Sequence, residues 1–174
     1  MTQKKGYWIT LIIITALSVG MNVFIVLQSC LDGAQSTGSS NIAANFFKAI
    51  INFFSPNAIN DGNWDSFCGV IRKLIGHFGF FAISGVLTTL SVDLWTHPYA
   101  AYRPYKPFVI SISGGFSLAG LTELIQRFIP NRSGEFKDVL IDFSGYLLGA
   151  FLVFLIIMLI VAKKKKRLQN PSQS

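Results

Sequence analysis

Apolar residues gather in four long runs along this chain, at residues 7–27, 74–94, 107–125 and 139–162. An α-helix rises about 1.5 Å per residue, so roughly 20 residues cross a hydrocarbon layer about 30 Å thick. Polar residues interrupt the third and fourth runs only near one end. We therefore predict an all-α, polytopic membrane protein, with four transmembrane helices in a single domain that covers residues 1–174.

A fifth apolar segment, residues 42–54, follows a Gly/Ser/Thr-rich stretch at 32–40 that we expect to be an exposed loop. As a helix this segment is only about 20 Å long, which is too short to cross. Its polar side chains recur at steps of three and four and so share one face; they are Asn41, Asn45, Lys48 and Asn52. We predict an extracellular interfacial helix here, with a re-entrant or packing helix as the alternative.

Composition supports a membrane protein and charge gives its orientation. Hydrophobic residues make up 51% of the chain and charged residues 13%, against about 25% charged residues in soluble domains. Lys4 and Lys5 precede the first span, and a basic run at 163–167 follows the fourth. Basic residues collect on the cytoplasmic side, so both termini are predicted to be cytoplasmic, with residues 163–174 as a basic tail. Because these lysines anchor a span, the net charge of +7 does not indicate a nucleic-acid partner.

The first span has a second interpretation, as a cleaved lipoprotein signal that ends at Cys30. Gln28 fits such a processing site poorly, and the run is long enough to span, so we expect an uncleaved helix. Cys30 and Cys68 are both predicted to lie outside. Two cysteines without metal-ligand spacing leave it open whether they pair.

Charged and amide side chains occur at the outer ends of the second, third and fourth spans, three or four positions apart within each span. The pairs are Lys73 with His77, Glu123 with Gln126, and Asp138 with Asp142. This spacing places each pair on one helix face, and the inner members lie about one turn, roughly 5 Å, below the surface. Since charges at that depth turn away from lipid, we expect them to converge with Arg132, from the following loop, on an outward-facing pocket. We call these seven residues the polar cluster.

Two glycines continue the line of the fourth-span carboxylates. Gly145 and Gly149 follow Asp142 at steps of three and four, so that face of the helix lacks side chains below the carboxylates. A Gly-x-x-x-Gly stripe lets another helix approach closely. We therefore predict that Gly145 and Gly149 pack against a neighbouring helix.

The polar cluster has a structural and a functional interpretation. In the first, ion pairs and hydrogen bonds fix the register of the helices; the expected pairs are Arg132 or Lys73 with Asp138 or Asp142, and His77 with Glu123. In the second, three acids, an imidazole and two or three basic groups exceed what register requires and bind a polar headgroup, while lipid-facing surfaces accept its apolar tail.

The arrangement resembles the VanZ-like family of bacterial membrane proteins. The residues that carry the resemblance are Lys73-x3-His77-Phe78, Glu123-x2-Gln126, Pro130-x-Arg132-Ser133 and Asp138-x3-Asp142-x2-Gly145-x3-Gly149. It covers about residues 28–161. The resemblance implies a multi-pass protein of the bacterial cell envelope, associated with lowered susceptibility to glycopeptide antibiotics, teicoplanin above all. One departure is Phe80 and Phe81, close to positions where family members often carry an acid and a tyrosine.

Our leading hypothesis is a non-enzymatic pocket that binds an amphiphile, such as a lipidated glycopeptide, a lipid-linked wall precursor or an anionic surface polymer, beside membrane lipid. The alternative is a membrane-embedded enzyme, in which His77 or Glu123 is a general base and Arg132 stabilises an anion. The chain lacks established catalytic motifs, so no catalytic residue is assigned. The spacing demands no metal, and neither a metal nor a cofactor is predicted. A transporter fits less well, because the charges concentrate at one surface instead of the midplane. The oligomeric state is left open.

Overall fold

The computed structural model describes residues 2–98, 102–132 and 134–169, and within these ranges it contains helices and no strand. The elements are α1 (Thr2–Ser29), α2 (Gly33–Phe54), α3 (Trp64–Ile71), a π-helix η1 (Arg72–Gly79), α4 (Phe80–Thr96), α5 (Lys106–Gln126) and α6 (Phe136–Gln169). Four helical stretches are long and apolar enough to cross a membrane: Lys5–Ser29, Trp64–Thr96, Lys106–Gln126 and Phe136–Lys166. The prediction of an all-α protein with four such helices is confirmed.

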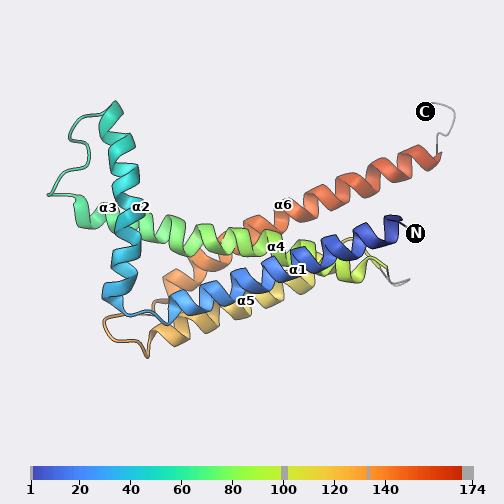
Figure 1. Ribbon diagram of the computed structural model, residues 1–174, viewed down its shortest axis with the longest axis horizontal. Coiled ribbons are helices and arrows are strands. Elements are labelled where there is room, and N and C mark those ends of the chain that lie inside the picture. Colours follow the sequence, from blue (N-terminus) through green and yellow to red (C-terminus); the bar gives the residue numbers. More distant parts are fainter. Residues whose placement is uncertain (1, 99–101, 133, 170–174) are drawn as a thin grey trace.

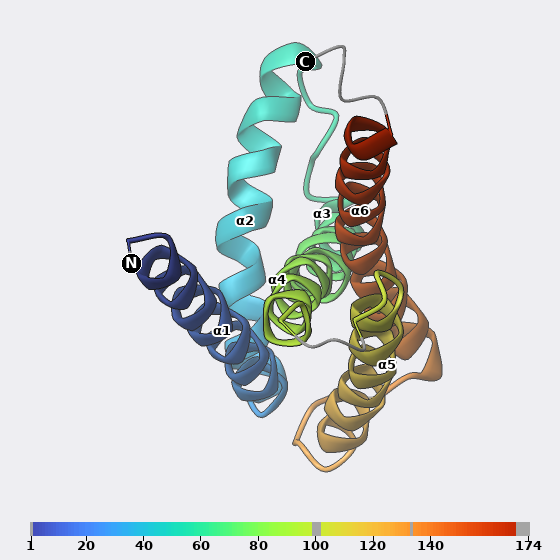
Figure 2. The ribbon, with the colours of Figure 1, turned by 90° about the vertical axis from the view of Figure 1, so that its right-hand side faces the viewer.

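The four long stretches form a bundle with α4 at its centre. α4 contacts α1, α5 and α6, and Figure 2 shows α1 on one side of it and α5 and α6 on the other. The start of α1, the ends of α4 and α6, and the start of α5 lie at one end of the bundle, which we call the terminal end (Figure 1). The opposite end, the α2 end, holds α2, α3 and the junction from α5 to α6.

α4 and α6 pack backbone to backbone through glycine. A Cβ atom added to Gly145 would lie 2.2 Å from the carbonyl oxygen of Phe78, and one added to Gly149 would lie 2.0 Å from that of Ala82. Gly85 on α4 meets the carbonyl of Tyr146 in the same way, at 2.2 Å. Because no side chain fits at these contacts, the glycines set how closely α6 approaches η1 and α4.

Hydroxyl and amide groups connect α4 to the helices around it. Thr15 of α1 pairs with Ser91 at 3.0 Å, and Ser84 donates to Asn22 at 2.6 Å. On the other side of α4, Thr89 donates to Ser111 of α5 at 2.7 Å. Such bonds between transmembrane helices average about 0.6 kcal/mol. Their main effect here is to fix the register of α4 against its neighbours.

Several predicted boundaries are wrong. The helix expected over 42–54 begins at Gly33, so most of the predicted loop at 32–40 is helical; adding residues to an existing helix needs no new nucleus. The helix that leads into the second apolar run begins at Trp64, before residue 74, because α3, η1 and α4 follow one another without a break. The fourth helix continues to Gln169, so the first part of the basic tail is helical. Residues 170–174 lie outside the described ranges.

α2 crosses the end of the bundle instead of running along it (Figure 1). Its polar side chains are used within the protein: Lys48 lies over the ring of Trp64, with its Nζ atom 4.9 Å from the centroid. Asn52 donates to the carbonyl of Ile59 and accepts from the Ile59 amide, each at 2.9 Å. In contrast, Phe53 and Phe54 at its end are about 80% exposed.

Candidate functional site

The first part of the site lies on the π-helix η1, which carries Lys73 and His77. In a π-helix each backbone amide bonds to the carbonyl five residues earlier. π-Helices are rare in proteins, but those that occur are often found at functional sites. The η1 segment contains Gly76 and Gly79. α-Helical spacing was expected for this pair, and the π-helical winding was not predicted. Both side chains nevertheless point to α6, where each finds an aspartate.

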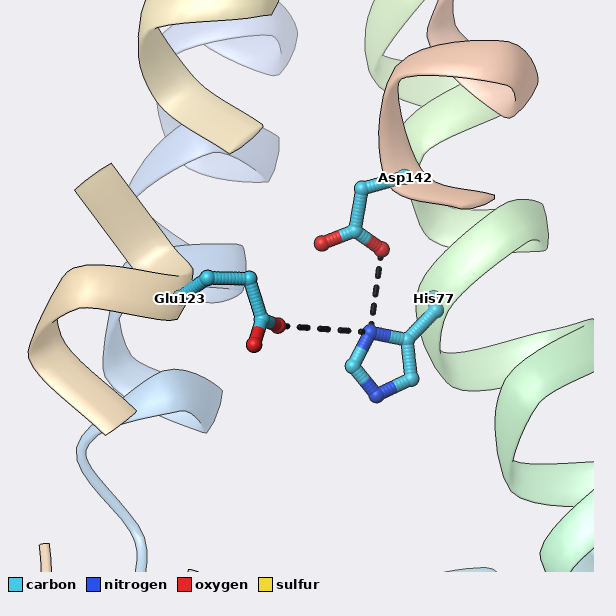
Figure 3. A group of neighbouring side chains, drawn as sticks. All are labelled: His77, Glu123 and Asp142. Atoms are coloured by element: carbon cyan, nitrogen blue, oxygen red, sulfur yellow. Dashed lines mark hydrogen bonds and ion pairs between the residues drawn. The ribbon is translucent and has the colours of Figure 1, made fainter. Parts of the chain in front are cut away.

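His77 lies between two carboxylates from two other helices. Its Nδ1 atom is 3.0 Å from Asp142 Oδ1 on α6 and 3.8 Å from Glu123 Oε1 on α5, as Figure 3 shows. The exposed fractions are 9% for His77, 3% for Glu123 and 1% for Asp142. The structure therefore brings side chains from three helices together at one point, as predicted.

Glu123 is held by bonds from two directions. Its Oε1 atom accepts a hydrogen bond from Gln126 Nε2 at 3.0 Å, and its Oε2 atom accepts one from the backbone amide of Glu135 at 3.1 Å. The chain before α6 folds tightly over the end of α5 at Gly134, where a Cβ atom would lie 2.3 Å from the Glu123 carbonyl oxygen. These contacts fix the orientation of the carboxylate. The role of the Glu135 amide was missed, because a backbone donor carries no sequence signal.

Lys73 and Asp138 form a second pair, which is more exposed than the group around His77. The Nζ to Oδ1 distance is 2.7 Å, and the side chains are 38% and 11% exposed. The exposure of Lys73 keeps this pair in contact with solvent or headgroups, unlike the carboxylates around His77.

Arg132 bonds to the end of α1. Its Nη1 atom lies within hydrogen-bond distance of three carbonyl oxygens, at 3.0 Å from Gln28, 3.3 Å from Ser29 and 3.4 Å from Leu31. Carbonyls at a helix C-terminus carry partial negative charge and favour a cation. Burial lowers the pKa of Arg132 from its ordinary value, with a further lowering from the charge of Arg72, but a guanidinium remains charged in proteins.

A cavity of about 210 Å³ opens beside the cluster at the α2 end. Its polar wall includes His77, Asp142, Gln126 and Arg132. Its apolar wall includes Phe24 and Ile25 of α1, Ala43 of α2, and Ile75, Phe80 and Phe81. Glu123, Lys73 and Asp138 belong to the polar cluster but do not line the cavity. Phe80 and Phe81 thus form part of an apolar wall.

The cysteines are not joined. Cys30 is exposed and Cys68 is half-buried, and both are free thiols. Cys30 and Cys68 therefore do not form a disulfide in this structure.

These observations define a class of protein: a membrane protein with four spanning helices and a buried histidine between two carboxylates. The sequence model of the VanZ/LLP1 family matches residues 7–159, a range that contains every residue of the polar cluster. The chain belongs to the VanZ/LLP1 family, and the resemblance drawn from its motifs is confirmed. Comparison with curated proteins found no match. Comparison with solved structures found none either.

Proposed function

We propose that this VanZ-like protein acts in the bacterial cell envelope, where its cavity binds an amphiphilic ligand and so lowers susceptibility to glycopeptide antibiotics such as teicoplanin. One observation carries the proposal. The same cavity joins a charged wall, with His77 and Arg132, to an aromatic wall, with Phe24, Phe80 and Phe81. A site with both surfaces is suited to a molecule that has a polar head and an apolar tail.

The polar wall favours an anionic headgroup. Arg132 brings a permanent positive charge, and Arg72, which is exposed, lines the same cavity. His77 makes its contacts to the carboxylates through Nδ1, and its Nε2 atom points away from both (Figure 3). These groups suit a phosphate or carboxylate. A volume of about 210 Å³ accommodates a headgroup and the start of a chain, so the rest of an acyl or polyprenyl chain stays in the membrane.

The orientation that we propose places this cavity outside. The start of α1 and the end of α6 share the terminal end of the bundle, and basic residues there include Lys5 and Lys163–Lys166. Because basic flanks stay in the cytoplasm, the α2 end faces outwards. α2 then lies in the outer interface: it crosses the bundle end, and its Phe46, Phe53 and Phe54 are exposed, as expected for a face in contact with lipid.

The test compares the two histidines of the chain in a teicoplanin-sensitive bacterial host. The variants are His77→Gln and Arg132→Gln, with His97→Gln, at the other end of the bundle, as the matched control. At equal membrane abundance, wild type and His97→Gln are expected to raise the inhibitory teicoplanin concentration. His77→Gln and Arg132→Gln are expected to lose most of that increase, and an unlipidated glycopeptide is expected to show a smaller one. Full protection by both cavity variants would refute a functional cavity.

A second function, a membrane-embedded hydrolase or transferase acting on a lipid-linked envelope substrate, is favoured by the geometry of His77. Asp142 holds one ring nitrogen at 3.0 Å, and the other nitrogen is directed away from the carboxylates. This is the arrangement in which a carboxylate orients an imidazole as general base. Membranes with wild-type protein would then produce a covalently changed lipid or antibiotic by mass spectrometry, and His77→Gln membranes would not. Unchanged species in both would leave binding as the function.

A further inference from the structure

We propose that His77, Glu123 and Asp142 bind one divalent transition-metal ion, of the kind represented by Zn²⁺ or Mn²⁺, at the wall of the cavity. Each residue offers a ligand atom, and these three atoms all lie within 4.8 Å of one another. They come from η1, α5 and α6, which the glycine contacts and the Glu135 amide hold together. The proposal does not depend on the ligand or the activity proposed above.

The distances suit a shared ion. Zinc lies about 2.0–2.1 Å from nitrogen and oxygen ligands, so two tetrahedral ligands are about 3.3 Å apart. His77 Nδ1 is 3.0 Å from Asp142 Oδ1 and 3.8 Å from Glu123 Oε1. These two values lie on either side of that separation, and all three donor atoms lie within 4.8 Å of one another. The two carboxylates must therefore close on the ion for all three donors to bind it.

An unpartnered oxygen marks the same point. Asp142 is 1% exposed, and its Oδ2 atom is buried with no hydrogen-bond partner among the described residues. In Figure 3 this oxygen points away from His77 and towards the side of Glu123. A buried carboxylate oxygen without a partner loses its hydration and gains nothing in return. A cation between Asp142 and Glu123 supplies the missing interaction.

Local charge favours a dication. When both are ionised, Asp142 and Glu123 bring two negative charges to one imidazole, and a single proton on His77 does not balance them. Lys73 is bonded to Asp138 at 2.7 Å, and Arg132 Nη1 is directed at the carbonyls of α1. A divalent ion neutralises both carboxylates and binds a neutral imidazole, which is the form that ligates metals.

The surroundings resemble those of a catalytic or exchangeable metal site more than those of a closed structural one. The hydrogen bonds from Gln126 and the Glu135 amide to Glu123 are outer contacts of the kind that orient a ligating carboxylate. One nitrogen and two oxygen donors leave at least one coordination position vacant. Two of the three residues, His77 and Asp142, line the cavity. We infer that a cavity ligand reaches the ion.

The experiment measures metal binding by the purified full-length chain, with no antibiotic present. After treatment with a chelator, the detergent-solubilised protein is mixed with Zn²⁺, Mn²⁺ or Co²⁺, passed through gel filtration and analysed for metal content; Co²⁺ also reports its ligand geometry by visible absorption. Wild type is expected to retain one ion per chain of at least one of these metals. Asp142→Asn and Glu123→Gln are expected to lower the affinity about tenfold or more.

Asp138→Asn is the matched control, because it changes a carboxylate one helical turn away that pairs with Lys73 and is not among the three ligands. It is expected to retain the ion. The proposal is overturned if wild type takes up none of the three metals, or if all variants bind as wild type does. Circular dichroism and gel filtration check that each variant folds; the wild-type measurement decides the question even if one variant does not.

Discussion

The two histidines of this chain lie at opposite ends of the same bundle and in unlike surroundings. His77, at the α2 end, is 9% exposed and contacts carboxylates from two other helices. His97, just after α4 at the terminal end, is exposed and packs against the ring of Tyr102 with centroids 4.6 Å apart. Tyr102 in turn donates a hydrogen bond to Asp93 at 2.7 Å.

The two histidines differ in how far along the chain their contact partners lie. At the terminal end the polar contacts of His97 and Tyr102 stay within about one loop, from Asp93 to Tyr102. At the α2 end His77 meets partners 46 and 65 residues away in the chain, at Glu123 and Asp142. Aromatic and polar groups that satisfy each other locally are typical membrane-surface anchors. Ionisable groups brought together from three helices require the fold to support them, which favours a functional role.

The largest expected effect comes from separating the helices at the α2 end. Gly145→Ala places a methyl group 2.2 Å from the Phe78 carbonyl oxygen, so α6 must move away from η1. Overpacking of this kind costs about 1–3 kcal/mol, and it also lengthens the His77 to Asp142 contact. We expect a clear fall in the thermal unfolding midpoint of the purified protein, together with loss of metal uptake.

Gly114→Ala on α5 is the control, because a Cβ atom there meets nothing within 4 Å. It is expected to unfold at the wild-type temperature or slightly above it, because alanine favours a helix more than glycine does. An equal fall in both variants would show that glycine content, and not the contact with η1, determines stability.

A smaller effect is expected at the terminal end from Tyr102→Phe, which removes the hydrogen bond to Asp93. A net loss of about 0.5–1.5 kcal/mol follows, with no change in metal uptake or in antibiotic susceptibility. If this variant impaired function as His77→Gln does, the proposed contrast between the two ends would be wrong.

The same tyrosine gives a signal in alkaline titration. Burial, with the hydrogen bond and charge of Asp93, raises the pKa of Tyr102 above its usual value of 10.0. Because the folded state prefers the neutral phenol, the stability that it contributes is present below pH 10 and is lost as pH rises towards the folded-state pKa. An ultraviolet titration is expected to show a late-ionising tyrosine that is missing in Tyr102→Phe.

The smallest effect is expected from Lys73→Met at the rim of the polar cluster. The Lys73 side chain is 38% exposed and that of Asp138 is 11% exposed. Exposed ion pairs contribute about 0.2–1 kcal/mol, and the burial of Asp138 places the expected loss at the upper end of that range. We expect a small fall in the unfolding midpoint and retained metal uptake. A loss as large as that of Gly145→Ala would mean that Asp138 and Lys73 belong to the same buried unit as His77.

Much of this arrangement could be predicted from sequence. Length and hydropathy identified four helices, and charges near the ends of apolar runs identified His77, Glu123 and Asp142 as inward-facing. Helical spacing and antiparallel connectivity placed them at one depth. Such reasoning succeeds because lipid strongly disfavours charge, so each charged residue in an apolar run restricts the fold.

Other features carry no such signal. The sequence left open whether Lys73 or Arg132 pairs with an aspartate, and which aspartate it is; the structure pairs Lys73 with Asp138. Arg132 bonds instead to the carbonyls of Gln28 and Ser29, because that contact depends on how α1 sits beside the loop. The α1 wall of the cavity, including Phe24, could not be distinguished from lipid-facing surface by periodicity alone. The helix over 33–40 was missed because local propensity favours a loop there, while the finished helix packs on α3.

The π-helix has a consequence for comparing this chain with its relatives. Shortening Arg72–Gly79 by one residue would let the segment wind with ordinary α-helical bonding. The hydropathy profile would hardly change, yet the imidazole would turn about the helix axis relative to α4. A histidine in this segment is therefore not enough to predict the contacts of His77 with Glu123 and Asp142 in a relative. The segment must also have the same length.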